Sequence, residues 1–431
     1  MLQKKKPKIA ILSLRNSYCY GGVLTSLKML YEFCSRYFEP TVFFLGFDHE
    51  ISTSLRHGTF SSSHRHVTYF GMNCVEVGAR WAFWEPGHYA YTHKEWETLL
   101  AEFHYFVAVS GTCIAAHPLA LLHKKYGLFI ATPYQEDRSE RVKQLSAPRK
   151  IIDMMAQKSM LAIEKNILEK AGYIWAMSSY CLEKFKRIAE LDNRRLACCG
   201  FPLDCSTLPV LTHKKEKTIV ALGRFSDPRK NLPMLMRVFD GIYKALGSAK
   251  LYVIGHRPSD EMLRPFMDMP SFKKIIFTGQ VSTGDLAHVL SQSCLMLLTS
   301  YQEGFGIAGI EAMLHGTPVI ATRCGGPEDF VIEGVTGYLV AINDDAAMQE
   351  KALVLLKDKN KRITMAYNAQ RFVVEHYDIP LVYDAFKKGF VQMHPELQDW
   401  FNRCDSYYKK QSSCGAVFHG IKEKGRENTC C

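Results

Sequence analysis

The chain has 431 residues, of which 47% are hydrophobic and 23% charged. This composition excludes wholesale disorder and allows two or three ordinary domains. The net charge of +11 fits phosphate-bearing small molecules or an anionic membrane surface. Nucleic acid is disfavoured as a partner, because the basic residues are spread out and accompany no nucleic-acid motif.

No stretch approaches the roughly 18 to 20 apolar residues of a membrane-spanning helix. The apolar run at residues 9–12 is too short for the core of a signal peptide. We therefore expect a cytoplasmic protein, and the basic N-terminal residues 4–8 leave peripheral contact with a membrane open.

The fourteen cysteines are scattered through apolar and helical contexts and form no CxxC pair or zinc-like Cys/His cluster. We expect most of them to be reduced, buried side chains, and we expect no metal site. The final pair, Cys430-Cys431, resembles the doubly prenylated ends of Rab-type GTPases, which leaves lipid anchoring as an alternative.

The first half begins with a buried-strand pattern at residues 8–14, which leads to the glycine pair Gly21-Gly22 and a helical pattern at 23–31. Short apolar runs bounded by turn residues and alternating with helices predict parallel sheets that are covered on both faces. The strand candidates that follow in this half are residues 41–45, 105–109 and 128–131.

The second half repeats this order, with a strand at 217–222, the pair Gly223-Arg224 and a helix at 232–246. The alternation of strands and helices is unusually clear here, so we predict a second α/β domain of Rossmann-like type. The further strand candidates are residues 250–254, 274–277, 294–298 and 317–321.

The boundary between the two halves is predicted from composition. Residues 206–216 carry proline and a polar run but no periodic apolar face, which indicates a linker. The first domain would then span residues 1–205 and the second residues 217–378. Residues 401–431 are expected to form a polar, cysteine-containing and loosely ordered tail.

The segment at residues 300–318 combines a strand end, a glycine-rich turn and a helix that starts near Gly306. Such a turn exposes backbone N–H groups and a helix N-terminus, both suited to an anion. Glu303 and Glu311 are eight residues apart, which on a helix is about 80° of rotation and roughly 12 Å of rise. They could face one elongated ligand and accept hydrogen bonds from its hydroxyls; two ordinary surface glutamates are the alternative.

A second candidate lies in the loop at residues 223–231. Arg224 can contact a diphosphate in bidentate fashion, and Lys230 supplies a point charge. We expect Arg229, between them, to point to solvent. A solvated basic loop is the alternative.

These motifs resemble the group 1 (family 4) retaining glycosyltransferases. The resemblance rests on the Glu303 to Glu311 spacing and on the glycine- and proline-containing segments 316–321 and 325–328, and it covers nearly all of residues 217–345. It implies a GT-B fold, in which two Rossmann-like domains face each other across a cleft. It also implies that residues 379–400 contain a helix that crosses back to the first domain.

The resemblance implies an activity: transfer of a sugar from a nucleotide-diphosphate sugar to a glycan, lipid or protein acceptor, with retention of configuration. Glu303 would lie near the donor sugar and Glu311 would hold the ribose, while Arg224 and Lys230 would neutralise the diphosphate, so that no metal or cofactor is needed. The implied catalytic residues are Glu303, Arg224, Lys230 and His117, and the implied donor-binding residues are Gly21, Gly22, Gly223, Gly304, Phe305, Gly306 and Glu311.

Over the first half the resemblance is looser. Many relatives have a functional histidine directly after the strand that here ends at Val109, whereas this chain has Ser110 there and reaches His117 only later. His117 either fills that role or begins a helix before a proline. Weaker candidates are His88, His93 and His104.

Two further segments carry alternatives. The loop at 131–138 is expected to open toward the interdomain cleft, where it would touch a substrate or remain an ordinary polar loop. The aromatic stretch at 81–86 favours core packing over an acceptor or membrane patch.

Two other functions remain at this stage: a catalytically silent sugar-nucleotide-binding protein and a nucleotide-sugar epimerase on the same fold. An oxidoreductase is disfavoured because the GxGxxG fingerprint does not follow the first strand.

Overall fold

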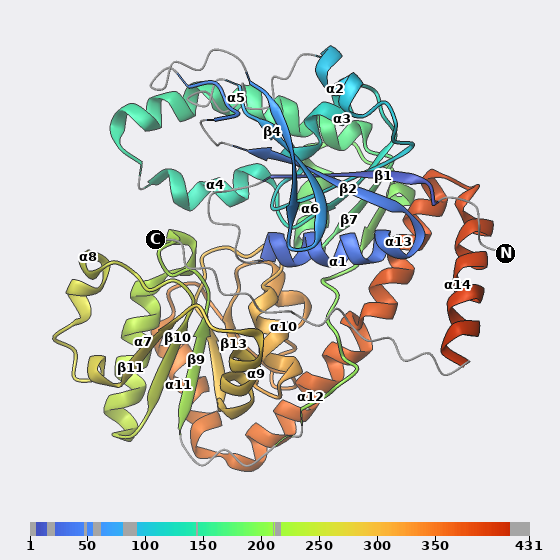
Figure 1. Cartoon of the computed structure of the whole chain (residues 1–431). Helices are drawn as coiled ribbons and strands as arrows, with labels where there is room; N and C mark the ends of the chain where they lie inside the picture. The colour runs from blue at the N-terminus through green and yellow to red at the C-terminus, as the bar shows by residue number, and fades with distance from the viewer. Residues whose placement is uncertain are drawn as a thin grey trace.

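The computed structural model describes residues 6–14, 22–46, 50–54, 62–80, 93–143, 145–209, 211 and 217–413. Within these ranges the chain forms two α/β domains, one above the other in Figure 1, each built around its own sheet. Gly21, the aromatic stretch at 81–86, His88 and the final cysteine pair lie outside the described residues.

The first domain has an eight-stranded sheet in the order β3-β4-β2-β1-β5-β6-β7-β8. All neighbouring strands are parallel except the antiparallel pair β3 and β4. The predicted strands at 8–14, 41–45, 105–109 and 128–131 are confirmed to within a few residues. The strands are β1 (Lys8–Leu14), β2 (Glu39–Gly46), β3 (His64–Tyr69), β4 (Met72–Gly78), β5 (Tyr105–Ser110), β6 (Tyr126–Ile130), β7 (Tyr173–Ala176) and β8 (Leu196–Cys198).

Helices cover both faces of this sheet (Figure 1), which explains why its central strands are apolar throughout. The loop predicted at 131–138 is largely helical, because α4 begins at Tyr134. The helices of this domain are α1 (Gly22–Tyr37), α2 (His93–Leu99), α3 (His117–Leu121), α4 (Tyr134–Lys143), α5 (Ala147–Lys170) and α6 (Ser179–Ile188).

The second domain has a six-stranded parallel sheet in the order β11-β10-β9-β12-β13-β14. The helix predicted at 232–246 and the strand predicted at 250–254 are confirmed at both ends. The strands are β9 (Thr218–Leu222), β10 (Lys250–Ile254), β11 (Ile275–Gly279), β12 (Leu295–Leu298), β13 (Val319–Thr322) and β14 (Gly337–Val340). The helices are α7 (Leu232–Leu246), α8 (Asp260–Leu263), α9 (Thr283–Gln292), α10 (Ile307–Leu314), α11 (Asp345–Lys357) and α12 (Lys359–Tyr377).

The chain then returns to the first domain, as predicted. Helix α13 (Ile379–Met393) packs against β6 and β7. Its Phe386 ring makes edge contacts with Phe129 and Trp175, with ring centroids 5.0 and 5.5 Å away. The second domain is therefore tethered to the first both through the linker and through a buried aromatic contact.

The prediction of a loosely ordered tail from residue 401 was wrong for residues 401–413. They belong to α14 (Leu397–Ser413), which packs against α1 and α13. Phe401 is 1% exposed, and the Trp400 indole donates a hydrogen bond of 2.8 Å to the carbonyl of Tyr37. A few apolar residues at helical spacing outweigh the otherwise polar composition of this segment.

Of the ten described cysteines, all are free and nine are buried, in agreement with the expectation of reduced, buried thiols. None of the helices in the described part of the chain is both long enough and apolar enough to cross a membrane.

Candidate active site

Two separate segments of sequence meet at the carboxyl edge of the second sheet. The loop at 223–231 follows β9 and the turn at 299–306 follows β12, and these two strands are neighbours in the sheet. Two hydrogen bonds hold the loop to the turn, from the Thr299 hydroxyl to the Lys230 carbonyl at 2.9 Å and from the Tyr301 N–H to the Arg229 carbonyl at 2.7 Å. Ligands of open α/β sheets bind at this edge.

Lys230 and Glu303 form an ion pair at this edge. The Lys230 ammonium lies 2.6 Å from Glu303 Oε1, and the two side chains are only 20% and 13% exposed. The Ser300 hydroxyl donates to the same oxygen at 2.6 Å. Burial alone would raise the pKa of the Glu303 carboxyl, but the Lys230 ammonium and the Ser300 hydroxyl outweigh it and hold that pKa below its ordinary value.

Arg224 lies in the same loop as Lys230, just after β9, and is exposed. Within the described residues its guanidinium forms no ion pair, although the charges of Asp227 and Asp137 act on it and raise its pKa against the effect of burial. Gly223 leaves room for the Lys230 stem, since a Cβ there would lie 3.3 Å from Lys230 Cε. The loop thus carries one exposed guanidinium and one ammonium paired with Glu303, and cations of these kinds bind diphosphates.

Arg229 was expected to point to solvent, and that expectation was wrong. Its side chain is 13% exposed and pairs with Asp227 of its own loop at 2.9 Å and with Asp137 of α4 at 2.6 Å. Arg141, also on α4, reaches Asp227 at 3.0 Å. Arg229 therefore belongs to a network of four charged side chains, with Asp227, Asp137 and Arg141, that joins the two domains.

Gly304 lies against the first domain. A Cβ on Gly304 would lie 2.0 Å from the Ala131 carbonyl oxygen, so only glycine permits this approach. The Gly304 carbonyl accepts a hydrogen bond of 2.5 Å from the Ser178 hydroxyl, and Gln302 donates to Thr132 at 3.0 Å. The loop at 131–138 therefore faces the second domain, as predicted.

The rest of the turn prepares the following helix. Gly306 caps the N-terminus of α10 with a φ of 93°, a conformation that favours glycine. The Phe305 side chain is 3% exposed and packs against Phe330 and Tyr377. Any contact of Phe305 with a donor would consequently come from its backbone.

Glu311 lies on α10, whereas Glu303 lies in the turn that precedes it. The helical spacing of about 80° and roughly 12 Å therefore does not describe the pair, because only one of the two residues is helical. Burial raises the pKa of the Glu311 carboxyl to about 7. The charge of this carboxylate is thus sensitive to pH near neutrality.

In the first domain, Gly22 lies against the turn that carries Glu303, and His117 begins α3. A Cβ on Gly22 would lie 2.8 Å from Ile307 Cδ1 at the start of α10, so the N-terminus of α1 meets the turn that carries Glu303. Burial first, and then the charge of Lys170, lower the pKa of His117 to about 4. Lys170 ends α5 just before β7, at the amino end of the sheet. His104 also lies at an amino end, just before β5.

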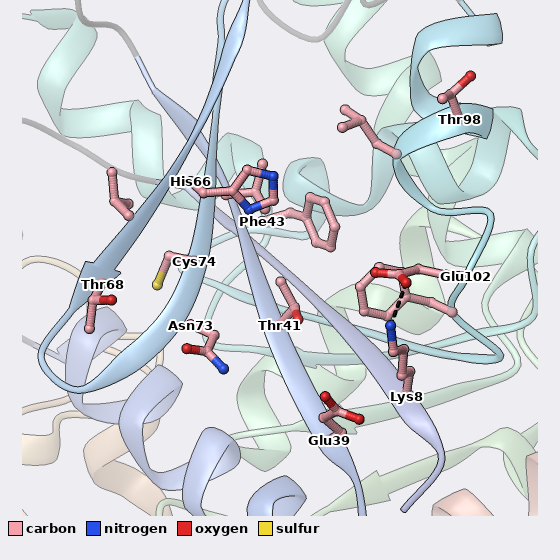
Figure 2. A pocket seen from close by; sticks show the side chains of 14 residues that line it. Lys8, Glu39, Thr41, Phe43, His66, Thr68, Asn73, Cys74, Thr98 and Glu102 are labelled. Carbon is pink, nitrogen blue, oxygen red and sulfur yellow. Dashed lines mark hydrogen bonds and ion pairs between the residues drawn. The ribbon is translucent and has the colours of Figure 1, made fainter. Parts of the chain in front are cut away.

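A separate pocket of about 590 Å³ lies at the other end of the first domain (Figure 2). Its lining includes Lys8, Glu39 and Glu102, which stand at or just before the amino ends of β1, β2 and β5. Because the carboxyl ends of these strands face the second domain, the pocket is remote from the Lys230–Glu303 pair.

Sequence reasoning missed the partners that hold the site together. Ser300 and Thr299 carry no motif, but both directly follow β12, where side chains reach the sheet edge. Asn231 adopts a left-handed conformation and caps α7 through a hydrogen bond to the Met234 N–H. An asparagine directly before an apolar helical run is the signal that would have found it.

Comparisons with known proteins agree with this geometry. Residues 209–372 match the model of the family described as glycosyl transferases group 1, and this segment contains both glutamates and both cations of the site. The structural neighbours are glycosyltransferases, so the predicted GT-B fold is confirmed. Together these findings show that the segment at 209–372 is similar to group 1 glycosyl transferases and that the chain has the GT-B fold.

Particular relatives can be named. The chain is 30% identical over 165 residues to N-acetyl-alpha-D-glucosaminyl L-malate synthase of Bacillus anthracis, covering 38% of this chain and 42% of that one. It is 32% identical over 143 residues to phosphatidyl-myo-inositol mannosyltransferase of Mycobacterium leprae, covering 33% and 38%. The chain thus spans about two fifths of the length of these relatives.

Among solved structures, the Anabaena protein HepE in complex with UDP and glucose superposes with a TM-score of 0.65 at 17% identity. The match covers 88% of this chain and 98% of that one. At 17% identity, the similarity shows only that the two proteins share a fold.

The interdomain charge network leads to a pH-dependent prediction. Replacing Arg229 by alanine should lower the free energy of unfolding by about 2 kcal/mol near pH 7, because Asp227 and Asp137 each lose one of the two arginines that they share. In the native protein the cations around Asp227 outweigh its burial and hold its pKa below the ordinary 3.8. The stabilisation is therefore present above pH 3.8 and is lost only as the pH falls through the lower pKa of the folded state, so the difference between the two proteins should narrow progressively below pH 3.8.

Urea unfolding at a series of pH values measures this difference. Arg237→Ala is the matched control, because it removes a more exposed ion pair with Asp345 and should cost less than about 1 kcal/mol. A difference between wild type and Arg229→Ala that does not narrow as the pH is lowered from 3.8 to about 2 would contradict the network.

Glu311 leads to a second prediction, on nucleotide binding. If its carboxylate accepts the ribose hydroxyls, affinity should rise as the carboxyl ionises through about pH 7, by up to about tenfold between pH 6 and pH 8. The Glu311→Gln protein should lack this pH-dependent rise in affinity. Calorimetric titration of both proteins with the same nucleotide isolates it, since the titration of the phosphates is common to both; parallel pH profiles would rule the role out.

Proposed function

We propose that this protein is a family 4 retaining glycosyltransferase, which moves a sugar from a nucleotide-diphosphate sugar to an acceptor. The observation that carries the proposal is the Lys230–Glu303 ion pair at 2.6 Å, whose lysine shares a loop with the exposed Arg224. The names of the relatives support it, since they describe a glucosaminyl-transferring synthase and a mannosyltransferase. HepE, which shares the fold, was solved with UDP and glucose.

The donor would lie along the carboxyl edge of the second sheet. Arg224 and Lys230 bind the diphosphate and stabilise the negative charge that it gains as the sugar leaves. Glu303 accepts hydrogen bonds from the hydroxyls of the sugar, and Glu311 accepts those of the ribose. The acceptor attacks from the face that the diphosphate departs, which retains the configuration.

The two cations take the place that a divalent ion holds in other transferases, so the proposed reaction needs neither a metal nor another cofactor. Arg229 is not a third phosphate ligand in this scheme, because Asp137 and Asp227 already occupy it. Contacts such as Gln302 to Thr132 bring the domains together over the donor. This closure excludes water and limits hydrolysis of the donor.

The acceptor, a glycan, lipid or protein, would bind mainly to the first domain, at the carboxyl ends of its strands. The loop after β6, Ser178 after β7 and the N-terminus of α1 at Gly22 all lie against the segment that carries Glu303. We propose a cytoplasmic location, which suits a donor made and kept in the cytoplasm.

Turnover of UDP-, GDP- and ADP-sugars in the presence of EDTA tests the proposal. We expect release of nucleotide from one donor class without added metal. Arg224→Ala should lower kcat by about 100-fold or more, because the charge that it stabilises develops during the reaction. Arg264→Ala, which removes another exposed cation of the same domain, should leave kcat unchanged.

Four results would contradict the proposal. Full turnover by Arg224→Ala would remove the assigned role, and dependence on a divalent ion would remove the metal-free scheme. Binding of a sugar nucleotide without any turnover would favour the catalytically silent alternative, while conversion of the donor sugar without an acceptor would favour an epimerase.

A further inference from the structure

The first half of α5 exposes an unusual amount of apolar surface. Four large side chains lie close together there, within little more than one helical turn, and their spacing places them on one side of the helix. Adjacent exposed side chains of this kind mark an interaction surface more often than scattered single ones do. We call this set the α5 patch: Ile151 at 56%, Ile152 at 38%, Met154 at 65% and Met155 at 64% exposure.

The opposite side of the same turns fixes how the α5 patch is presented. Asp153 is 9% exposed and forms an ion pair with Arg138 of α4. Ala156 and Met160 are buried in the first domain. The helix is therefore held by its inner face, and its apolar outer face is left to solvent.

The charges around the α5 patch are of one sign. Residues 141–158 contain five basic residues and one acidic residue, and that acidic residue is Asp153, which is turned inward toward Arg138. The exposed basic side chains of this segment are Lys143, Arg149, Lys150 and Lys158. An apolar face rimmed by basic side chains is the composition of surfaces that bind an anionic bilayer.

The α5 patch also lies close to the proposed active site. Helix α4 lies along the interdomain network, because Asp137 pairs with Arg229 and Arg141, in the last turn of the helix, reaches Asp227. Only a few residues separate Arg141 from the start of α5 at Ala147. The α4–α5 hairpin projects to one side of the first domain in Figure 1. A surface bound to this hairpin would therefore lie near the entrance to the cleft.

We propose that the α5 patch docks the protein on an anionic membrane surface, with Ile151, Met154 and Met155 inserted among the lipid headgroups and Lys150 and Lys158 against lipid phosphates. The docking itself does not require the proposed function. If both hold, the hairpin positions the cleft to receive an acceptor that is carried by a lipid of the same membrane, and this last step rests on the proposed function.

Co-sedimentation of the full chain with vesicles tests the docking. We expect binding to vesicles of phosphatidylcholine with added phosphatidylglycerol and little binding to phosphatidylcholine alone. The triple substitution Ile151→Ser, Met154→Ser and Met155→Ser should weaken binding by at least about tenfold. The pair Lys150→Glu and Lys158→Glu should weaken it as well and should remove most of its salt dependence.

A matched control removes three apolar side chains of the second domain that are exposed by 38 to 41%, through Met267→Ser, Ile276→Ser and Ile363→Ser. It should bind vesicles as the wild type does. The proposal is overturned if the wild type does not bind anionic vesicles or if the α5 triple variant binds them as the wild type does. It is equally overturned if the control variant loses as much vesicle binding as the α5 triple variant. It is also overturned if the α5 substitutions abolish a dimer in light scattering without affecting vesicle binding, because the patch would then be an interface between copies.

Failure of the docking can be told apart from failure of the proposed function. The α5 triple variant keeps every residue of the donor site, so stabilisation by a nucleotide should be the same as in the wild type whatever the vesicles show.

Discussion

The ion pair between Lys230 and Glu303 is the contact on which the candidate site depends. It joins the loop after β9 to the turn after β12, and it holds the Glu303 carboxylate 2.6 Å from the Lys230 ammonium. Two opposite charges that are mostly withdrawn from water are stable only as partners. An arriving diphosphate would compete with Glu303 for the ammonium, which would turn the carboxylate toward the sugar. In the proposed mechanism the pair thus keeps the site assembled before the donor binds.

Contacts between the two domains lie next to the loop and the turn that carry this ion pair. Arg229, which the sequence suggested would point to solvent, forms ion pairs with Asp137 and Asp227. Arg224 of the same loop is exposed and forms no ion pair within the described residues. A cleft that closes through charged groups rather than through an apolar interface can open again, since such interfaces release their partners into water at small cost.

A feature could be predicted from the sequence where the residues that determine it are close together along the chain. Helix α7 was predicted at both ends, and its limits are determined locally, since Asn231 and Gly247 cap it. The Glu303 turn was found because its glycines precede an apolar helix. The pairing of Arg229 with Asp137 could not be predicted, because it depends on how two domains face each other across 92 residues of sequence. Helix α14 was missed because its buried face consists of few residues in a polar segment.

The measurement that tests the central claim most directly is a thermal-shift comparison of UDP, GDP and ADP with the wild type and Lys230→Met, in EDTA. The account predicts that one nucleoside diphosphate raises the Tm of the wild type and that the shift is lost in the variant, because the ammonium that binds the diphosphate is gone. No shift with any nucleotide at millimolar concentration, or an equal shift in Lys230→Met, would contradict the assignment of this edge as the donor site.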